Sequence, residues 1–112
     1  MHRVVITGIG CLSSLGLTAS AHIDATREGS TGVAECTQID PGKLSSKMVA
    51  EIKNFRPEDY LSKKVLGMVD RVSVLALVAA AEAIADSGLV FDGELGEQTA
   101  VILGTGIGGM TT

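Results

Sequence analysis

The residues whose spacing suggests chemistry lie near the end of the chain, in the stretch T-A-V-I-L-G-T-G-I-G-G-M at residues 99–110. This stretch holds four glycines, Gly104, Gly106, Gly108 and Gly109. Three of them fit the spacing G-x-G-x-x-G, which in nucleotide-binding units places a pyrophosphate at the N-terminus of the following helix. Only Thr105 and Ile107 carry side chains among them, so another molecule or segment can approach this backbone closely. Two interpretations stay open: a ligand-binding loop, or glycines that only let a strand turn tightly.

The cysteines and histidines suggest neither a metal site nor a catalytic pair. Cys11 and Cys36 lack the C-x-x-C spacing and nearby histidines of a zinc site. Since a reducing compartment disfavours a single disulfide, both are expected to be free, buried thiols. His22 has no evident carboxylate or nucleophile beside it in the sequence, so we interpret it as a surface or half-buried residue.

Composition narrows the class of protein. The 112 residues are 46% hydrophobic and include 14 glycines, but only one Tyr, two Phe and no Trp. The core must therefore be aliphatic, which suits closely packed helices on a sheet. A net charge of −4 argues against a nucleic-acid partner, which needs a basic surface. No run reaches the roughly 18 apolar residues of a membrane span, and the N-terminus lacks a signal-peptide pattern, so a cytoplasmic protein with no membrane contact is expected.

Two short apolar runs predict buried strands near the two ends of the chain. Val4–Thr7 is rich in β-branched residues and ends in glycine, and Val101–Leu103 does the same. Helical sequence separates them, which predicts neighbours in one largely parallel sheet with their glycine ends at the same edge. Ligands commonly bind at such an edge in α/β sheets. The predicted fold class is α/β, with a mixed, largely parallel sheet packed against a long buried helix.

The first half of the chain predicts small elements. A helix is expected from Thr18 or Ser20 to about Glu28, because either hydroxyl can cap its start. Residues 30–46 are polar and broken by glycine and proline, which predicts a surface loop. Residues 48–52 alternate apolar and polar side chains, as in a half-exposed strand.

The second half predicts one long helix. Pro57, followed by acidic residues, indicates a helix start, and the long helix is expected over Lys63–Ser87. Its apolar positions recur at spacings of three and four and widen almost all the way round, so most of its surface should be buried. Asp70 and Arg71 interrupt it; an ion pair or hydrogen-bond network is favoured over a catalytic acid. Gly88 is expected to end the helix as a C′ glycine, and a loop is expected over residues 90–98.

Five motifs together resemble a known family. They are V-V-I-T-G-I-G-C-L-S-S-L-G, P-E-D-Y-L-S-K-K, M-V-D-R, A-D-S-G-L and the closing G-T-G-I-G-G. Their order and separations also agree with the family over almost the whole chain. In this they look like the first quarter of a type II β-ketoacyl-acyl carrier protein synthase. The resemblance implies the N-terminal part of a thiolase-like fold, with residues 1–112 belonging to one ketosynthase N-terminal domain and no second domain in this chain.

The resemblance also implies an activity. Family members condense an acyl thioester with malonyl-acyl carrier protein, releasing carbon dioxide, in fatty acid or polyketide synthesis. They need no cofactor and use a cysteine thiolate and two histidines. These three residues would lie beyond position 112, so this chain alone is expected to hold no catalytic residue. The expected partners are acyl carrier protein, acyl and malonyl thioesters, and a second synthase subunit in a homodimer or heterodimer.

Site residues follow from the same resemblance. The expected acyl-pocket residues are Thr105, Gly106, Ile107, Gly108 and Gly109. Ile107 falls where the family sets pocket depth and gates access to the cysteine. Lys63 and Lys64 match the carrier-docking region, although Gly67 and Met68 stand where the family often has a basic pair. This departure keeps open an alternative: a non-catalytic partner of the chain-length-factor type, or an inactive truncated fragment.

Overall fold

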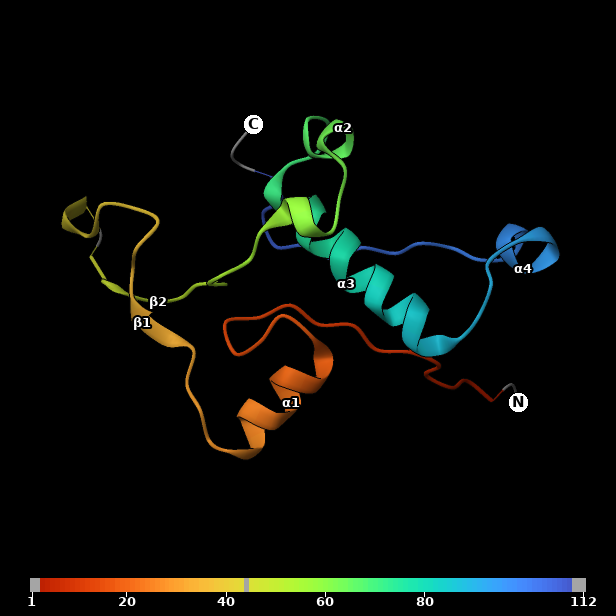
Figure 1. The fold of residues 1–112 in the computed structure, drawn as a ribbon, viewed down its shortest axis with the longest axis horizontal. Helices are drawn as coiled ribbons and strands as arrows, with labels where there is room; N and C mark the ends of the chain where they lie inside the picture. The colour runs from red at the N-terminus through yellow and green to blue at the C-terminus, as the bar shows by residue number, and fades with distance from the viewer. Residues whose placement is uncertain (1–2, 44, 110–112) are drawn as a thin grey trace. The chain divides into compact units, whose positions relative to one another are not determined.

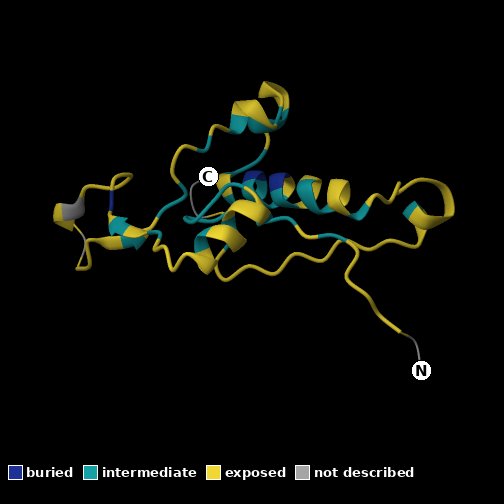
Figure 2. Cartoon of the chain, turned by 60° about the horizontal axis from the view of Figure 1, so that its bottom comes forward, coloured by how far each residue is buried: buried dark blue, intermediate teal, exposed yellow. Residues whose placement is uncertain are grey.

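The computed structural model describes residues 3–43 and 45–109 (Figure 1). The chain divides into two units, and each is described by itself. The hairpin unit comprises Cys11–Arg56, and the helical unit comprises Met1–Gly10 together with Pro57–Thr112. Figure 2 shows that most of the described chain is exposed or half-buried, with buried positions in only a few places.

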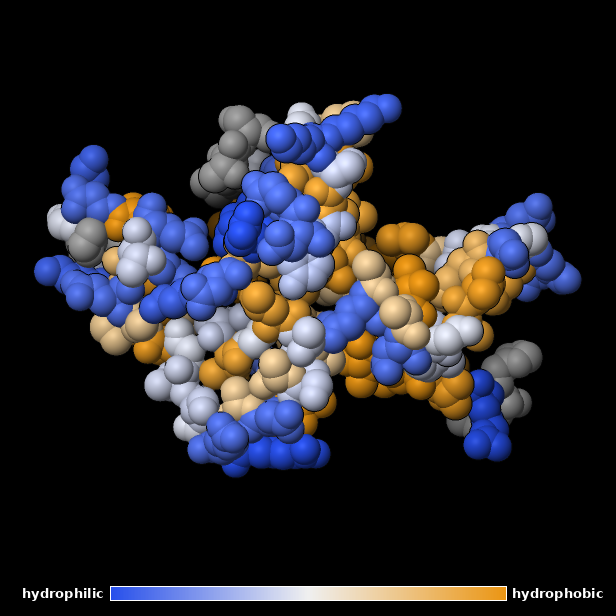
Figure 3. Space-filling view, in the orientation of Figure 1, coloured by the Kyte–Doolittle hydropathy of each residue, from blue (hydrophilic) through white to orange (hydrophobic). Residues whose placement is uncertain are grey.

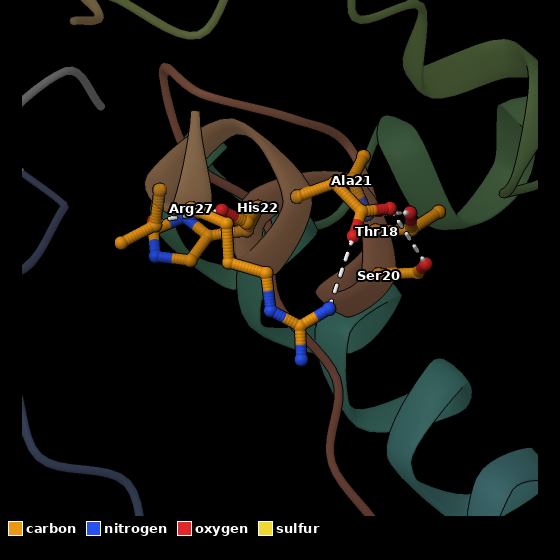
Figure 4. Close-up of polar contacts among 7 residues, drawn as sticks. Thr18, Ser20, Ala21, His22 and Arg27 are labelled. Atoms are coloured by element: carbon orange, nitrogen blue, oxygen red, sulfur yellow. Dashed lines mark hydrogen bonds and ion pairs between the residues drawn. The ribbon is translucent and has the colours of Figure 1, made fainter. Parts of the chain in front are cut away.

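Helix α1 spans Ala19–Arg27 in the hairpin unit. The Thr18 hydroxyl caps its first turn by accepting a hydrogen bond from the backbone N–H of Ala21 at 3.2 Å (Figure 4). Such a cap satisfies one of the N–H groups that a helix start leaves without a partner. On the exposed face, Arg27 pairs with Asp24 at 3.4 Å. The predicted helix is confirmed, and of its two candidate caps, Thr18 and Ser20, the structure uses Thr18.

A small antiparallel sheet gives the hairpin unit its name. Its elements are strand β1 (Val33–Glu35), the 3-10 helix η1 (Pro41–Lys43) and strand β2 (Met48–Ala50). Ala34 lies opposite Val49 in the register. Strand β2 confirms the predicted half-exposed strand. The prediction of a surface loop over residues 30–46 was wrong, because β1 lies within that range. Strand β2 needs a partner for its backbone hydrogen bonds, and β1 supplies it.

The carboxylate of Glu51, directly after β2, holds the chain that follows β1. The backbone N–H groups of Thr37 and Gln38 donate to it at 3.1 Å, and the Thr37 hydroxyl donates at 2.7 Å. The Sγ of Cys36, which is buried, also donates to it at 3.2 Å. These bonds, the Thr37 hydroxyl first, lower the pKa of Glu51 to about 2. The carboxylate therefore stays charged, and the hairpin stays tied, at any pH well above that value.

The described part of the helical unit contains three short elements and one longer helix. They are η2 (Pro57–Asp59), α2 (Lys63–Leu66), α3 (Arg71–Ser87) and α4 (Gly93–Glu97). The helix start predicted at Pro57 is present as a 3-10 turn. The loop predicted over residues 90–98 was wrong, since it contains α4. That helix is supported by a pair one turn apart, in which the Gln98 amide donates to Glu94 at 3.0 Å.

The single helix predicted over Lys63–Ser87 is divided in two. Helix α2 ends at Gly67, and α3 starts after Asp70, whose backbone is extended and whose carboxylate accepts the Ser73 N–H at 3.0 Å. An aspartate in this position caps a new helix instead of continuing the old one. The interruption at Asp70 is thus a hydrogen-bonded cap, as the sequence favoured.

Only one stripe of helix α3 is buried among the described residues. Val74 and Val78 are 4% and 5% exposed, whereas Leu77 and Ile84 remain 43% and 49% exposed. The prediction of a helix covered on most sides is therefore not met by the residues described. Figure 3 shows apolar side chains over much of the visible surface around α3. Among residues 3–43 and 45–109, no helix is both long and apolar enough to cross a membrane.

The two predicted buried strands are not formed in the described chain. Within it, the β1–β2 pair is the sheet that the structure contains, and it is antiparallel, so the predicted largely parallel sheet is absent there. The side chains of Val4 and Val101 are 92% and 95% exposed. A strand is defined by the backbone hydrogen bonds of a neighbouring strand, and neither segment has such a neighbour here. The coarser prediction, a mixed α/β structure, is confirmed.

Candidate functional site

The first segment of the helical unit, residues 3–10, lies along α3 (Figure 1). A Cβ atom on Gly8 would overlap the backbone carbonyl oxygen of Ala83, and one on Gly10 would overlap that of Ala79. Backbone meets backbone at both places, and only glycine leaves enough room. The glycines that end the first apolar run therefore serve close packing against the helix.

A hydrogen bond fixes this segment to the C-terminal end of α3. The backbone N–H of Ile9 donates to Oδ2 of Asp86 at 2.9 Å. Asp86 belongs to the motif A-D-S-G-L, and Ile9 belongs to V-I-T-G-I-G, so two motifs far apart in the sequence meet here. Gly88 follows with a φ of 63° and ends the helix in the left-handed conformation, as predicted.

The glycine-rich loop, residues 104–109, lies at the other end of α3. Ile107 is 80% exposed, and a Cβ atom on Gly104 or Gly106 would meet nothing within 4 Å. Gly108 has a φ of 75°, and its N–H donates to the Thr105 hydroxyl at 3.0 Å. The loop therefore has a defined turn with an open outer face. Met110, the last residue of the motif stretch, lies outside the described residues.

Asp70 touches the end of this loop. A Cβ atom on Gly109 would overlap Oδ2 of Asp70, so the third glycine of the G-x-G-x-x-G spacing lies against a carboxylate. Hydrogen bonds from Ser73, its backbone N–H first, lower the pKa of Asp70 and keep that carboxylate charged near neutral pH. A negative charge at this glycine opposes a pyrophosphate, which argues against the nucleotide-binding interpretation.

An apolar groove of about 380 Å³ lies between α3 and the last apolar run. Its lining residues are Val69, Ser73, Ala76, Leu77, Ala80, Val101, Ile102 and Leu103. Small alanines on the helix leave the groove open, while the branched side chains of the apolar run stand along its edge. This groove continues toward the glycine-rich loop through Leu103.

The two expected docking lysines lie on a different element from the loop. Lys63 and Lys64 form the first turn of α2, and both are exposed. The hydroxyl of Ser62 caps this helix by accepting the Val65 N–H at 3.4 Å. Met68, just after α2, is 68% exposed. The surface around the lysines thus mixes two cations with an apolar side chain.

His22 has a partner that the sequence did not indicate. Its Nδ1 lies 2.7 Å from Oγ of Ser13 in the hairpin unit, and the same hydroxyl accepts the N–H of Leu15 at 3.1 Å. The pair ties the Ser13–Gly16 turn to helix α1. A hydroxyl nine residues before a histidine is too common a spacing to signal this contact in advance. His22 is half-buried, as predicted.

Comparison with known proteins decides the family. Residues 1–112 match the family described as beta-ketoacyl synthase, N-terminal domain. The chain belongs to this family. A relative in Staphylococcus aureus, 3-oxoacyl-acyl-carrier-protein synthase 2, is 38% identical over 110 residues, which are 98% of this chain and 27% of the relative. A protein of the same name in Synechocystis is 32% identical over 108 residues, 96% of this chain and 26% of that protein.

A solved structure supports the same assignment for this ketosynthase-family chain. The ishigamide ketosynthase/chain length factor matches 77% of this chain and 21% of its own length, with a TM-score of 0.69 and 28% identity. The chain thus spans about a quarter of the length of the synthases that it resembles. The resemblance inferred from the five motifs is confirmed.

Proposed function

We propose that this chain forms the N-terminal part of a 3-oxoacyl-acyl-carrier-protein synthase, called here the parent protein. The parent protein condenses an acyl thioester with malonyl-acyl carrier protein by decarboxylative Claisen condensation, without a cofactor. The observation that carries this proposal is the family match over all of residues 1–112, supported by relatives that are named as synthases. Those names favour a condensing enzyme over a non-catalytic chain-length factor. Dimerisation with a second synthase subunit and a cytoplasmic location belong to the same proposal.

The exposed apolar segments support a larger sheet in the parent protein. Gly8 and then Gly10 contact α3 at successively earlier residues of the helix. The last segment, residues 101–109, also meets successively earlier residues: Val101 lines a pocket with Ile84, and Gly109 contacts Asp70. Both segments therefore run in the same direction, opposite to α3, as parallel strands joined through a helix do. In the parent protein, strands from the remaining sequence would complete a largely parallel, thiolase-like sheet.

The acyl pocket is assigned to the glycine-rich loop, at Thr105, Gly106, Ile107, Gly108 and Gly109. The open outer face of this loop and the 80% exposure of Ile107 leave its sec-butyl group free to line a cavity completed by the rest of the parent protein. Small neighbours would let an acyl chain approach the backbone closely. The depth of the cavity would then depend on the side chain at position 107.

The variant Ile107→Phe is expected to shorten the acyl chains that the parent protein accepts. Overfilling a packed pocket costs about 1–3 kcal/mol, or roughly a 5- to 150-fold loss of kcat/KM at 1.4 kcal/mol per factor of ten. That loss should fall on long acyl-carrier substrates and spare short ones. The matched control is Ile107→Leu, which keeps the volume and should keep the preference. If both variants condense short and long substrates in the wild-type ratio, Ile107 does not line the pocket.

Carrier docking is assigned to Lys63 and Lys64 on α2. Acyl carrier proteins are acidic, so cations on this exposed turn would speed their association. Gly67 and Met68 supply no charge where the family often has a basic pair, so docking should be slow. Adding the charges is compatible with the fold, since Gly67 has a helical φ of −75° and its nearest neighbour lies 3.5 Å from an added Cβ.

The double variant Gly67→Arg, Met68→Lys is expected to associate with an acidic acyl carrier protein several-fold faster than wild type at low salt. Its rate should also fall more steeply as salt rises, because added cations strengthen a screened attraction. Stopped-flow association with the parent protein across a salt series measures both. A Gly67→Gln, Met68→Gln variant controls for side-chain size. Identical rates and salt slopes in all three proteins would place carrier docking elsewhere.

A further inference from the structure

Asp70 caps helix α3 through hydrogen bonds between its carboxylate and both the backbone and the side chain of Ser73. Its Oδ1 accepts the Ser73 N–H at 3.0 Å, which is sufficient for the cap. A serine, threonine or asparagine could make the same bond. The backbone cap needs only Oδ1 as an acceptor, while Oδ2 of the same carboxylate lies close to Gly109.

The second oxygen meets the glycine-rich loop. Oδ2 of Asp70 occupies the place where any residue other than glycine would carry its Cβ at position 109. The preceding residues are tied together, since Gly108 N–H donates to the Thr105 hydroxyl at 3.0 Å and Gly108 adopts a φ of 75°. Fixing Gly109 against Asp70 thus fixes the end of a turn that includes Ile107.

The opposite end of α3 also carries an aspartate that meets a neighbouring segment, there through a hydrogen bond. Asp86 lies in the last turn of the helix and accepts the N–H of Ile9 at 2.9 Å, beside Gly8 and Gly10. An aspartate at each end of α3 therefore contacts one of the two segments that run along the helix. Asp86 holds the first segment, and Asp70 contacts the last one.

We propose that Asp70 is a positioning residue, which caps α3 with Oδ1 and limits the movement of the glycine-rich loop, and with it Ile107, through the contact of its carboxylate with Gly109. The effect of this role on acyl-chain choice rests on the proposed function, in which Ile107 lines the acyl pocket. The effect on the position of the loop is independent of the proposed function. Asp70 contacts no substrate in this account and acts only through residues 105–109.

Three variants of the parent protein separate capping from positioning. Asp70→Ser keeps the cap but removes the group that reaches Gly109. Asp70→Asn keeps the cap and the shape of the contact. Asp70→Ala removes both. Thermal unfolding should leave the serine and asparagine variants near wild type and lower the Tm of the alanine variant.

The deciding readout is amide hydrogen exchange of the peptide that covers residues 104–109. Asp70→Ser should raise its exchange rate several-fold with the Tm unchanged, and Asp70→Asn should restore the wild-type rate. In condensation assays, Asp70→Ser should also reduce the preference between short and long acyl substrates several-fold. Unchanged exchange in Asp70→Ser would overturn the positioning role. Two other outcomes would retain the positioning role but count against the proposed function. One is faster exchange in Asp70→Ser when the parent protein has no condensing activity. The other is faster exchange with an unchanged preference between short and long acyl substrates.

Discussion

Gly10→Ala is expected to destabilise the parent protein by about 1–3 kcal/mol, a large effect for one methyl group. The added Cβ would overlap the carbonyl oxygen of Ala79 and lie 2.8 Å from the backbone nitrogen of Ala83. Both atoms belong to the hydrogen-bonded backbone of α3, so neither can move aside without disturbing the helix. The expected result is a lower urea midpoint with an unchanged slope.

A glycine with free space beside it provides the control for this prediction. Gly67→Ala adds the same methyl group where the nearest atom is 3.5 Å away and the backbone is helical. Its effect should stay within about 0.5 kcal/mol, as for other substitutions outside packed regions. Equal stability of the two variants would mean that residues 3–10 do not pack on α3 in the parent protein.

Local hydrogen bonding made the helix ends predictable from the sequence. Thr18 and Gly88 act within one turn of their own position, so residue type alone indicated a cap and a left-handed end. Asp70 shows the limit of the same approach. The sequence marked it as a polar interruption in need of partners, but the strong apolar periodicity on both sides predicted one continuous helix across it.

The sheet was harder to predict because strands depend on distant partners. The runs Val4–Thr7 and Val101–Leu103 have the composition of buried strands, yet the described chain offers them no ladder. Strand β1 was missed for the opposite reason: Val33–Glu35 is short and lies in polar sequence, and its pairing with β2 decides its conformation. Pairing across the sequence, more than local preference, determined both outcomes.

The sequence indicated the position of the candidate site, but it did not indicate the contacts that support it. The glycine spacing and the family motifs both indicated residues 104–109. The contact between Asp70 and Gly109, and the bond from Ile9 to Asp86, join residues far apart in the chain and leave no local signature. Each of these contacts nevertheless involves residues of the quoted motifs, which gives a physical reason for their presence at those positions.

The cysteines of this chain are not expected to carry the acyl group. Cys36 is 7% exposed and donates its thiol to Glu51, so a carrier-bound thioester cannot reach its sulfur. Cys11 is half-buried and forms no disulfide in the described part of the chain, and the proposed function places the nucleophile beyond residue 112. Loss of both thiols, in a Cys11→Ala, Cys36→Ala variant of the parent protein, should therefore leave acyl-enzyme formation intact.

The measurement that tests the account most directly is to map the acyl group on the parent protein. Wild type and the double cysteine variant are incubated with acyl-acyl carrier protein, digested and analysed by mass spectrometry. We expect an acyl thioester on a cysteine beyond residue 112 in both proteins, with Cys11 and Cys36 unmodified in wild type. An acyl group on Cys11 or Cys36, lost in the variant, would contradict it.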